Sequence, residues 1–328
     1  MAKKLVCTVT KQRFEKYQVF FPQDWEITYL DVPYTDEQLI EAIGDKEYLF
    51  VGAVHPVSAN VINACPNLKF IQSEGVAFDK IDVKAAKEKG IWVSNNRGAN
   101  AGGVAEHTIA LILAAYRRMA LYDRRLRRED FATVKSESLA MGIHEFGGKH
   151  LGFVGMGAIA KEVAKRLKGW NVKMSYYDTF RPTPDEEKEL GVEYMEFDEL
   201  CKACDVISMH VPVFPETVGM MSDKQFDEMK NTAILVNTAR GEVIDDNALA
   251  KALEEGKIAH AALDVLVPEP TPKDHVLMNM SKEGMDRLTL TPHIGGMTDE
   301  AFITMLTGSI YNFEAMEAGN EPKNIVNR

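Results

Sequence analysis

The chain has 328 residues, a net charge of −11 and an apolar content of 45%. Its length exceeds what one hydrophobic core usually supports, so we expect two domains. Acidic residues outnumber basic ones by 49 to 38, which argues against nucleic acid or an anionic membrane as a partner. No apolar segment approaches the roughly 18 residues of a membrane helix, and the N-terminal apolar run is too short for a secretory signal. We therefore expect a cytoplasmic protein.

The four cysteines do not suggest a disulfide framework in a chain of this size. Cys201 and Cys204 form an isolated C-x-x-C in a segment that predicts a short helix entering a buried strand. Because a second pair of ligands is missing, we interpret both cysteines as structural and predict no metal site.

Short β-rich runs alternate with helical patterns through the first hundred residues. Strands are expected within 4–9, 26–32, 48–54, 68–76 and 91–96, and helices within Asp36 to Ile43 and Val83 to Lys89. This alternation predicts βαβ units on a parallel sheet.

A longer helical pattern, from Val104 to Arg118, then breaks this rhythm. The small and flexible stretch "NRGANAGG" precedes it, and we interpret the helix as the crossing into a second domain. The arginine-rich run at 124–128 is typical of a helix face that is solvated or contacts another subunit.

The alternation resumes from Gly148. Strands are expected within 150–156, 171–178, 192–195, 205–212, 233–239, 259–265 and 288–293, with helices between them such as Ile159 to Lys168 and Asp245 to Glu255. Such apolar strands are buried on both faces, as in a sheet covered by helices on each side. A final helix, Asp299 to Ala318, is expected to pack back on the first domain.

A glycine-rich turn follows the first strand of this second region. Gly155 allows the tight turn, Gly157 lets the backbone approach a pyrophosphate, and Ala160 takes the third place of G-x-G-x-x-G/A, which only eases packing. Asp178 ends the next strand, where its carboxylate can accept hydrogen bonds from the ribose hydroxyls and repel a 2′-phosphate. The pattern predicts NAD in preference to NADP, although Arg181 would weaken that preference if it lay over the ribose.

Three further stretches at strand ends offer Arg240, Glu269 and His293. A guanidinium, a carboxylate and an imidazole at neighbouring strand ends suit a catalytic site, but they are also common as structural ion pairs. The residues alone leave both interpretations open.

Taken together, the motifs resemble those of the D-isomer-specific 2-hydroxyacid dehydrogenase family. The matching stretches occur in the family's order: "SEGVAFDKID", "NAGGVAEHTIALIL", "GFVGMGAIA" with Asp178, "HVPVFPETVGMM", "AILVNTARGEVID", "ALDVLVPEP" and "TPHIGGMT". The resemblance implies an α/β protein with two doubly wound parallel-sheet domains. A Rossmann NAD domain, residues 101–297, would be inserted into a flavodoxin-like substrate domain formed by residues 1–100 and completed by 298–328.

The resemblance assigns the catalytic roles to Arg240, Glu269 and His293. The planar guanidinium of Arg240 would bind the carboxylate of a 2-oxo acid and polarise its carbonyl. His293 would protonate the nascent alkoxide, or accept the proton in the oxidative direction, while Glu269 holds the imidazole and favours its charged form.

The resemblance also assigns the binding residues. The expected cofactor contacts are Gly155, Gly157, Ala158, Ile159, Asp178, Val211, Pro212, Thr217, Thr238 and Asp264. The backbone amides of Gly75 and Val76 would bind the substrate carboxylate together with Arg240.

Several residues depart from the family pattern. Glu74 is an anion beside the expected carboxylate site, and Arg97 stands where the family often has proline; both are candidates for substrate selectivity or for exposed surface. His55 could face the site or cap a turn, whereas His107 and His210 are expected to be structural. The segment between Glu269 and His293 is a few residues longer than the family pattern.

These observations predict an NAD-dependent D-2-hydroxyacid dehydrogenase that acts on a small 2-oxo or 2-hydroxy acid. Two alternatives stay open, an NAD-sensing corepressor-like protein on the same scaffold and a phosphite dehydrogenase, whereas Glu269 disfavours a formate dehydrogenase, whose pattern has glutamine there. The family implies a homodimer built around the NAD domains. The sequence does not identify the acid.

Overall fold

The computed structural model describes residues 3–328, which form two compact units. The first comprises the residues up to Asn100 together with Met297–Arg328, and the second comprises Ala101–Gly296. No helix between residues 3 and 328 has the length and apolar character needed to span a membrane.

The first unit contains a five-stranded parallel sheet in the order β2-β1-β3-β4-β5. In the register of this sheet, Leu5 of β1 pairs with Ile27 of β2 and with Tyr48 of β3. The chain order therefore reverses between β1 and β3, as in flavodoxin-like folds. The strands are β1 (Lys3–Cys7), β2 (Trp25–Tyr29), β3 (Tyr48–Val51), β4 (Phe70–Ser73) and β5 (Trp92–Ser94).

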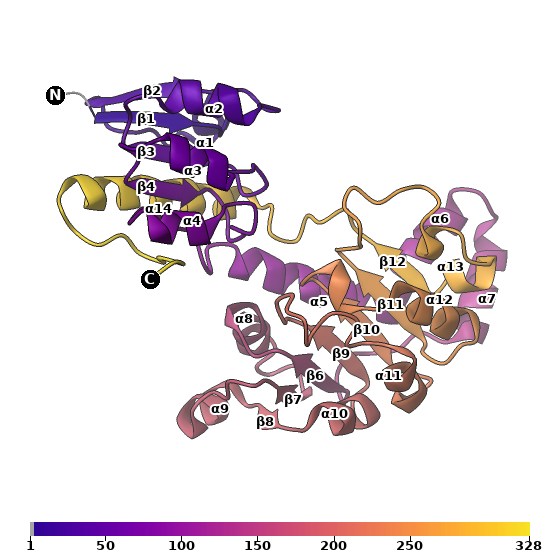
Figure 1. Cartoon of the computed structure of the whole chain (residues 1–328). Helices are drawn as coiled ribbons and strands as arrows, with labels where there is room; N and C mark the ends of the chain where they lie inside the picture. Colours follow the sequence, from indigo (N-terminus) through magenta and orange to yellow (C-terminus); the bar gives the residue numbers. More distant parts are fainter. Residues whose placement is uncertain (1–2) are drawn as a thin grey trace. The chain divides into compact units, whose positions relative to one another are not determined.

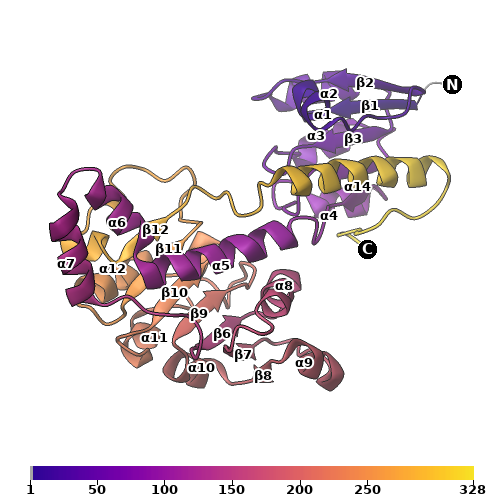
Figure 2. The ribbon, with the colours of Figure 1, turned by 180° about the vertical axis from the view of Figure 1, so that it is seen from behind.

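Helices cover both faces of this sheet, and each face has its own apolar core. The helices are α1 (Lys11–Tyr17), α2 (Asp36–Ile43), α3 (Ala59–Ala64), α4 (Val83–Glu88) and α14 (Asp299–Glu317). Leu39, Val61 and Ala86 bring α2, α3 and α4 into one core, while Phe14 and Phe313 bring α1 and α14 into the other. Figure 1 shows the first group in front of the strands, and Figure 2 shows α14, in yellow, on the opposite face.

The second unit contains a seven-stranded parallel sheet in the order β12-β11-β10-β9-β6-β7-β8. Counted from β6, this is the Rossmann order with one additional strand, and its reversal lies between β6 and β9. The strands are β6 (His150–Val154), β7 (Lys173–Tyr177), β8 (Glu193–Tyr194), β9 (Val206–Met209), β10 (Ile234–Asn237), β11 (His260–Leu263) and β12 (Leu288–Leu290).

Apolar helices again cover both faces of the sheet. Ile112 of α5 and Val163 of α8 pack in one core, and Leu200 of α10, Phe226 of α11 and Leu249 of α12 pack in the other. Figure 2 shows α5 and α8 over the near face of the unit. The helices are α5 (Ala101–Arg117), α6 (Met119–Leu126), α7 (Phe131–Met141), α8 (Ala158–Arg166), α9 (Pro184–Leu190), α10 (Phe197–Ala203), α11 (Asp223–Glu228), α12 (Asp246–Glu254) and α13 (Lys282–Met285), with 3₁₀ turns η1 (Gly241–Val243) and η2 (Val276–Met278).

The prediction of two doubly wound parallel sheets is confirmed, and a strand overlaps every predicted run, although β1 and β2 each begin one residue before the predicted start. The predicted start of α5 was wrong. The sequence pattern placed it at Val104, but the helix begins at Ala101 and includes Gly102 and Gly103. A Cβ on Gly102 would lie 3.3 Å from the Arg166 guanidinium at the end of α8. Close packing of α5 on α8 therefore outweighs the low helix propensity of glycine.

The interpretation of Cys201 and Cys204 as structural residues is confirmed. Both side chains are fully buried in the core beside α10, as free cysteines. Burial raises the pKa of each thiol to about 12, which keeps both as unreactive thiols at neutral pH.

Two buried histidines of the second unit couple stability to pH. Nε2 of His260 lies 2.9 Å from the Thr289 hydroxyl, and Nε2 of His210 lies 2.8 Å from the Ser208 hydroxyl. Burial lowers the pKa of both rings to about 3, so each stays neutral in the folded chain and becomes protonated on unfolding below about pH 6.5. Their stabilising contribution is therefore present above that pH and is lost as the pH falls.

We predict that the urea midpoint of the wild-type protein falls between about pH 7 and pH 5 and that His260→Gln makes this decline shallower. Each buried histidine should account for up to about 1.4 kcal/mol of unfolding free energy per pH unit in that window. The exposed His144, changed to Gln, is the matched control and should leave the slope unaltered. Parallel pH profiles for the wild type and His260→Gln would contradict this account.

Candidate active site

The predicted site residues of the second unit lie at or just beyond the carboxyl ends of its strands. Gly155 follows β6, Asp178 follows β7, Val211 follows β9, Thr238 follows β10 and Asp264 follows β11. Because all these strands are parallel, their carboxyl ends meet at one edge of the sheet, where α/β proteins bind ligands.

The glycine-rich turn has the conformation that the fingerprint requires. Gly155 has φ 94°, and a Cβ there would lie 2.8 Å from the backbone carbonyl of His210, so only glycine fits. A Cβ on Gly157 would instead enter open space. Ala160 is fully buried in the core beneath α8, where its methyl group only fills space.

The turn leads into the N-terminus of α8, which suits an anion. Gly157 is the N-cap and provides no side-chain cap, and the first turn has no acidic residue. Ala158 is exposed and Ile159 is half-buried. The N–H groups of the first turn can therefore bind a pyrophosphate, which fits the predicted dinucleotide.

Asp178 is held in place by the same turn. Its Oδ2 accepts a hydrogen bond of 2.6 Å from the Met156 N–H, and its Oδ1 accepts one of 2.8 Å from the Phe180 N–H. Each oxygen keeps a lone pair for a ribose hydroxyl. Arg181 forms an ion pair of 3.1 Å with Glu187 and stacks on the Tyr194 ring at 4.2 Å. These contacts engage its guanidinium with Glu187 and Tyr194.

The remaining predicted cofactor residues differ in what their side chains do. Val211 is half-buried and Pro212 is exposed. The Thr217 hydroxyl donates to the Pro212 carbonyl at 2.7 Å, which closes the turn after β9. Thr238 is buried and bonds at 2.9 Å to Thr108, so its hydroxyl stabilises the contact with α5.

Arg240 lies in a loop fixed by a buried asparagine and a glycine. The Asn237 side chain donates to the Arg240 carbonyl at 2.8 Å and accepts from the Ala239 N–H at 2.9 Å. A Cβ on Gly241 would lie 2.6 Å from the carbonyl oxygen of Leu266, so this loop touches the backbone of the loop that carries Glu269. The sequence analysis missed Asn237, although it stands inside the quoted motif.

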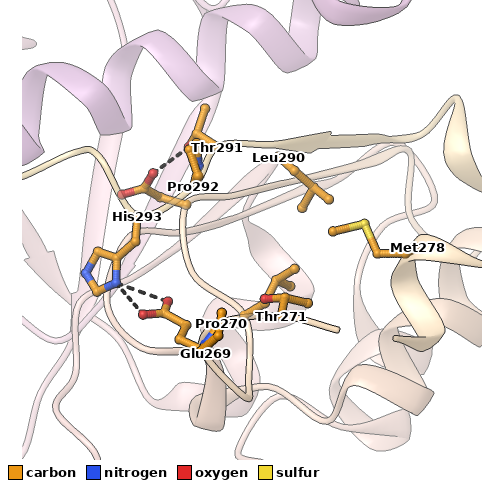
Figure 3. Close-up of a pocket in the computed structure, with 10 residues that line it drawn as sticks. Glu269, Pro270, Thr271, Met278, Leu290, Thr291, Pro292 and His293 are labelled. Carbon is orange, nitrogen blue, oxygen red and sulfur yellow. Dashed lines mark hydrogen bonds and ion pairs between the residues drawn. The ribbon is translucent and has the colours of Figure 1, made fainter. Parts of the chain in front are cut away.

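Glu269 and His293 form a direct pair. Nδ1 of His293 lies 2.8 Å and 3.0 Å from the two carboxylate oxygens, and both side chains are less than half exposed, at 44% and 43%. Figure 3 shows the imidazole with its other nitrogen directed away from Glu269. Because an ionised carboxylate only accepts hydrogen bonds, Nδ1 carries a proton and Nε2 is the atom available for proton transfer.

Asp264 anchors the segment that carries His293. Its backbone carbonyl accepts the His293 N–H at 2.7 Å, and its buried carboxylate accepts bonds from Thr291, Ile294 and Gly295 at 2.5, 3.0 and 2.8 Å. Burial raises the pKa of Asp264, but hydrogen bonds from His107, Thr291 and these amides outweigh it and hold the pKa well below its ordinary value. The carboxylate therefore stays ionised and keeps the segment in place.

A pocket of about 490 Å³ adjoins this pair within the second unit. Glu269 and His293 line one side, and the sulfur of Met278 and the side chain of Leu290 face it from the other, as Figure 3 shows. His275, in the long segment between the catalytic candidates, closes the loop because its Nε2 lies 3.0 Å from the Val267 carbonyl.

The predicted carboxylate loop lies in the first unit, directly after β4. Asn95 and Asn96 bind its carbonyl groups: Asn96 donates to Glu74 at 2.7 Å, its N–H donates to Gly75 at 2.9 Å, and Asn95 donates to Val76 at 2.6 Å. Between residues 3 and 328 the N–H groups of Gly75 and Val76 have no hydrogen-bond acceptor. Two adjacent free donors suit a carboxylate.

The residues that depart from the family pattern have different environments. Arg97 is exposed, but Glu74 is buried, with its carboxylate paired to Arg13, so the alternative of exposed surface was wrong for Glu74. His55 is half-buried and bonds at 2.7 Å to Thr8. The sequence analysis missed Asn95, Asn96 and Arg13, and only the adjacent pair of asparagines after a strand carried a signal.

In the part of the chain that the structure describes, no group of three or more histidine, cysteine or acidic side chains is arranged to hold a metal ion. The donors gathered at the two strand edges are suited to anions and to proton transfer.

The comparisons with known proteins agree with this geometry. Residues 109–295 match the family model of the D-isomer specific 2-hydroxyacid dehydrogenase NAD binding domain. A glyoxylate reductase of Korarchaeum cryptofilum is 38% identical over 91% of this chain and 88% of its own length. A hydroxypyruvate reductase of Thermotoga maritima is 39% identical over 81% of this chain and 83% of its own length.

Solved structures of 2-hydroxyacid dehydrogenases also superimpose on this chain. The apo form of Rhodotorula graminis D-mandelate dehydrogenase superimposes with a TM-score of 0.85 and 28% identity, covering 100% of this chain and 98% of its own. An NAD-complexed D-isomer specific 2-hydroxyacid dehydrogenase from Lactobacillus delbrueckii has a TM-score of 0.82 and 26% identity, covering 99% and 100%.

A Rossmann unit whose glycine-rich turn suits an anion, with an imidazole–carboxylate pair at the same sheet edge, is the arrangement expected of a dehydrogenase. The chain belongs to the D-isomer-specific 2-hydroxyacid dehydrogenase family, and it is an NAD-dependent oxidoreductase of 2-hydroxy acids.

The two glycines of the turn should respond differently to substitution by alanine. We predict that Gly155→Ala lowers the melting temperature, because its Cβ meets backbone and its φ is positive. Gly157→Ala should leave the melting temperature of the coenzyme-free protein unchanged but weaken NADH binding about tenfold or more, because its methyl group enters the space needed by the pyrophosphate. Calorimetry and thermal melting check both. Normal NADH affinity in Gly157→Ala would contradict the assigned position.

Proposed function

We propose that the protein reduces short 2-oxo acids to D-2-hydroxy acids with NADH, the first unit binding substrate and the second binding coenzyme. The observation that carries this proposal is the hydrogen bond between Nδ1 of His293 and Glu269, which leaves Nε2 free. The enzyme names of the relatives and the unpaired amides of the first unit support it.

His293 moves the proton in this mechanism. In the charged ring, Nε2–H donates to the substrate oxygen as that oxygen gains negative charge, and Glu269 stabilises the imidazolium. In the reverse reaction the ring starts neutral with its proton on Nδ1, and the Nε2 lone pair accepts the hydroxyl proton. Glu269 keeps the same tautomer throughout, so a single geometry serves both directions.

Arg240 and the N–H groups of Gly75 and Val76 bind the substrate carboxylate. A guanidinium offers two parallel donors that match a carboxylate, and amide donors without internal acceptors add directional bonds at little cost. Arg240 also polarises the keto oxygen and so makes C2 more electrophilic.

NAD supplies the hydride when it is bound. The proposal assigns the pyrophosphate to Gly155, Gly157, Ala158 and Ile159 and the ribose to Asp178. It also assigns Val211 and Pro212 to the adenine, Thr217 to the phosphates, and Thr238 and Asp264 to the nicotinamide, so these residues would hold the coenzyme when it is bound. The fixed carboxylate of Asp178 would repel a 2′-phosphate, which favours NADH over NADPH.

The proposed function is tested with a panel of glyoxylate, hydroxypyruvate, pyruvate and phenylpyruvate, each with NADH and NADPH. We expect nicotinamide oxidation with at least one short 2-oxo acid and a higher kcat/KM with NADH. Coenzyme binding without turnover of any acid in the panel would contradict the proposal.

For His293→Ala we predict a loss of kcat on the order of 10²-fold or more, because the proton donor is removed. NADH affinity should remain near that of the wild type. The exposed His144→Ala serves as the control and should retain full activity. Near-normal turnover in His293→Ala would remove this residue from the proposed role.

We also propose that the protein is a homodimer that associates through α6, α7 and the loop after them. Large apolar side chains are exposed along this segment: Met119, Leu126, Phe131, Leu139, Met141 and Ile143. Phe131 and Leu139 are 67% and 70% exposed, and such a concentration of apolar surface is typical of an interface. Two neighbouring arginines are paired within the segment, Arg125 with Glu129 and Glu137 and Arg127 with Asp123, which lowers the cost of burying their charge.

The double variant Phe131→Glu, Leu139→Glu should elute as a monomer in size-exclusion chromatography with light scattering, because two charges would be buried at the interface. Phe20→Glu, at an exposed aromatic residue of the first unit, is the control and should remain dimeric. A dimer that persists in the double variant would show that another surface is used.

A further inference from the structure

A second polar cluster lies in the first unit, next to the proposed carboxylate loop. It consists of Thr8 after β1, Arg13 in α1, His55 after β3 and Glu74 after β4, and we call these four residues the edge cluster. They gather around the point where the strand order of this sheet reverses, between β1 and β3. Doubly wound sheets bind ligands at that point.

The ion pair between Arg13 and Glu74 gives the cluster its orientation. Nη1 of Arg13 lies 2.7 Å and 2.6 Å from the two oxygens of Glu74. The Glu74 side chain is 6% exposed, whereas that of Arg13 is 36% exposed and stacks on the Phe302 ring at 4.8 Å. The Glu74 carboxylate is therefore more deeply buried than the Arg13 guanidinium, and it neutralises the charge of that group.

The Arg13 guanidinium has hydrogen-bond donors that Glu74 does not use. Among residues 3–328, the side-chain hydrogen bonds of Arg13 involve only Nη1, so Nε–H and the Nη2 hydrogens have no acceptor in the described chain. Burial raises the pKa of Glu74, and the charge and hydrogen bond of Arg13 oppose this rise. The pair thus presents hydrogen-bond donors without a net charge.

His55 adds a polar group beside Arg13. A Cβ on Gly52 would lie 2.6 Å from the imidazole, so this glycine allows the ring to pack directly on the backbone. Nδ1 of His55 lies 2.7 Å from the Thr8 hydroxyl, and Nε2 has no partner in the described chain. Burial, together with the charge of Arg13, lowers the pKa of His55 and favours its neutral form.

The edge cluster adjoins the carboxylate loop through Glu74 and through Ala53, which precedes His55. Glu74 directly precedes Gly75, and a Cβ on Gly75 would lie 2.7 Å from the Cβ of Ala53, two residues before His55. A 2-oxo acid whose carboxylate binds Gly75 and Val76 therefore has the edge cluster within reach of its next carbon atoms.

We propose that the edge cluster binds the C3 substituent of the substrate and selects a 2-oxo acid that carries a C3 hydroxyl, as hydroxypyruvate does. This inference rests on the proposed function, because it takes the carboxylate to lie on Gly75 and Val76. A hydroxyl can accept from Arg13 and exchange a hydrogen bond with His55. A methyl or phenyl group would cover these donors without pairing them, and a phosphate dianion would meet a guanidinium that Glu74 already neutralises.

The test compares kcat/KM for hydroxypyruvate and pyruvate, with glyoxylate, which has no C3, as the internal reference. We expect the wild type to prefer hydroxypyruvate by about tenfold or more, the usual effect of a hydrogen bond to a charged group. In the double variant Arg13→Met, Glu74→Gln this ratio should fall to about one, while kcat/KM for glyoxylate changes less than about threefold. The double variant is used because Arg13→Met alone would leave Glu74 buried and unpaired.

A second variant and a control make the result decisive. His55→Phe keeps a ring over Gly52 but removes both nitrogen atoms, and it should also reduce the preference for hydroxypyruvate. Lys11→Met, at an exposed lysine of the same helix as Arg13, should leave it unchanged. An unaltered ratio in both test variants, or a parallel loss with glyoxylate, would overturn the inference. Absence of turnover with every acid, glyoxylate included, would instead overturn the proposed function and this inference with it.

Discussion

The candidate active site depends on the buried carboxylate of Asp264. His293 has φ 54°, in the left-handed region that a residue with a Cβ adopts at a cost of about 1 kcal/mol or more. The bonds from Thr291, Ile294 and Gly295 to Asp264, together with the bond from the His293 N–H to its carbonyl, hold the segment in that conformation. Asp264 thereby directs the imidazole toward Glu269, and a residue assigned to coenzyme binding also positions the proposed proton donor.

Close backbone contacts complete this arrangement. Gly241 lets the loop of Arg240 touch the backbone of Leu266, only three residues before Glu269. Asn237 fixes the other side of the same loop. The guanidinium and the carboxylate therefore belong to loops that support each other, although one follows β10 and the other follows β11.

The two units use one architectural principle for different ligands. In each, parallel strands bring loops distant in sequence to one edge, and the strand order reverses beside the edge cluster in the first unit and beside the glycine-rich turn in the second. The second unit offers a helix N-terminus and a fixed carboxylate, which suit a dinucleotide. The first offers free amides and a neutralised arginine, which suit a small polar acid under the proposed function.

The sequence by itself determined the alternation of strands and helices, the glycine-rich turn and the sites of Arg240, Glu269 and His293, because hydrophobic period and turn chemistry are local. The start of α5 was not predictable, since it depends on close packing against α8. The hydrogen bond between Glu269 and His293 required the fold, because 24 residues separate them.

Tertiary structure also decided the environment of Glu74. Its sequence neighbours suggest an exposed anion, but the carboxylate is buried in the first unit and pairs with the partly exposed Arg13, 61 residues away. The free N–H groups of Gly75 and Val76 likewise depend on Asn95 and Asn96, about 20 residues further along the chain. A charge or a donor acquires its chemical role from the groups that surround it, and those groups come together only when the sheets form.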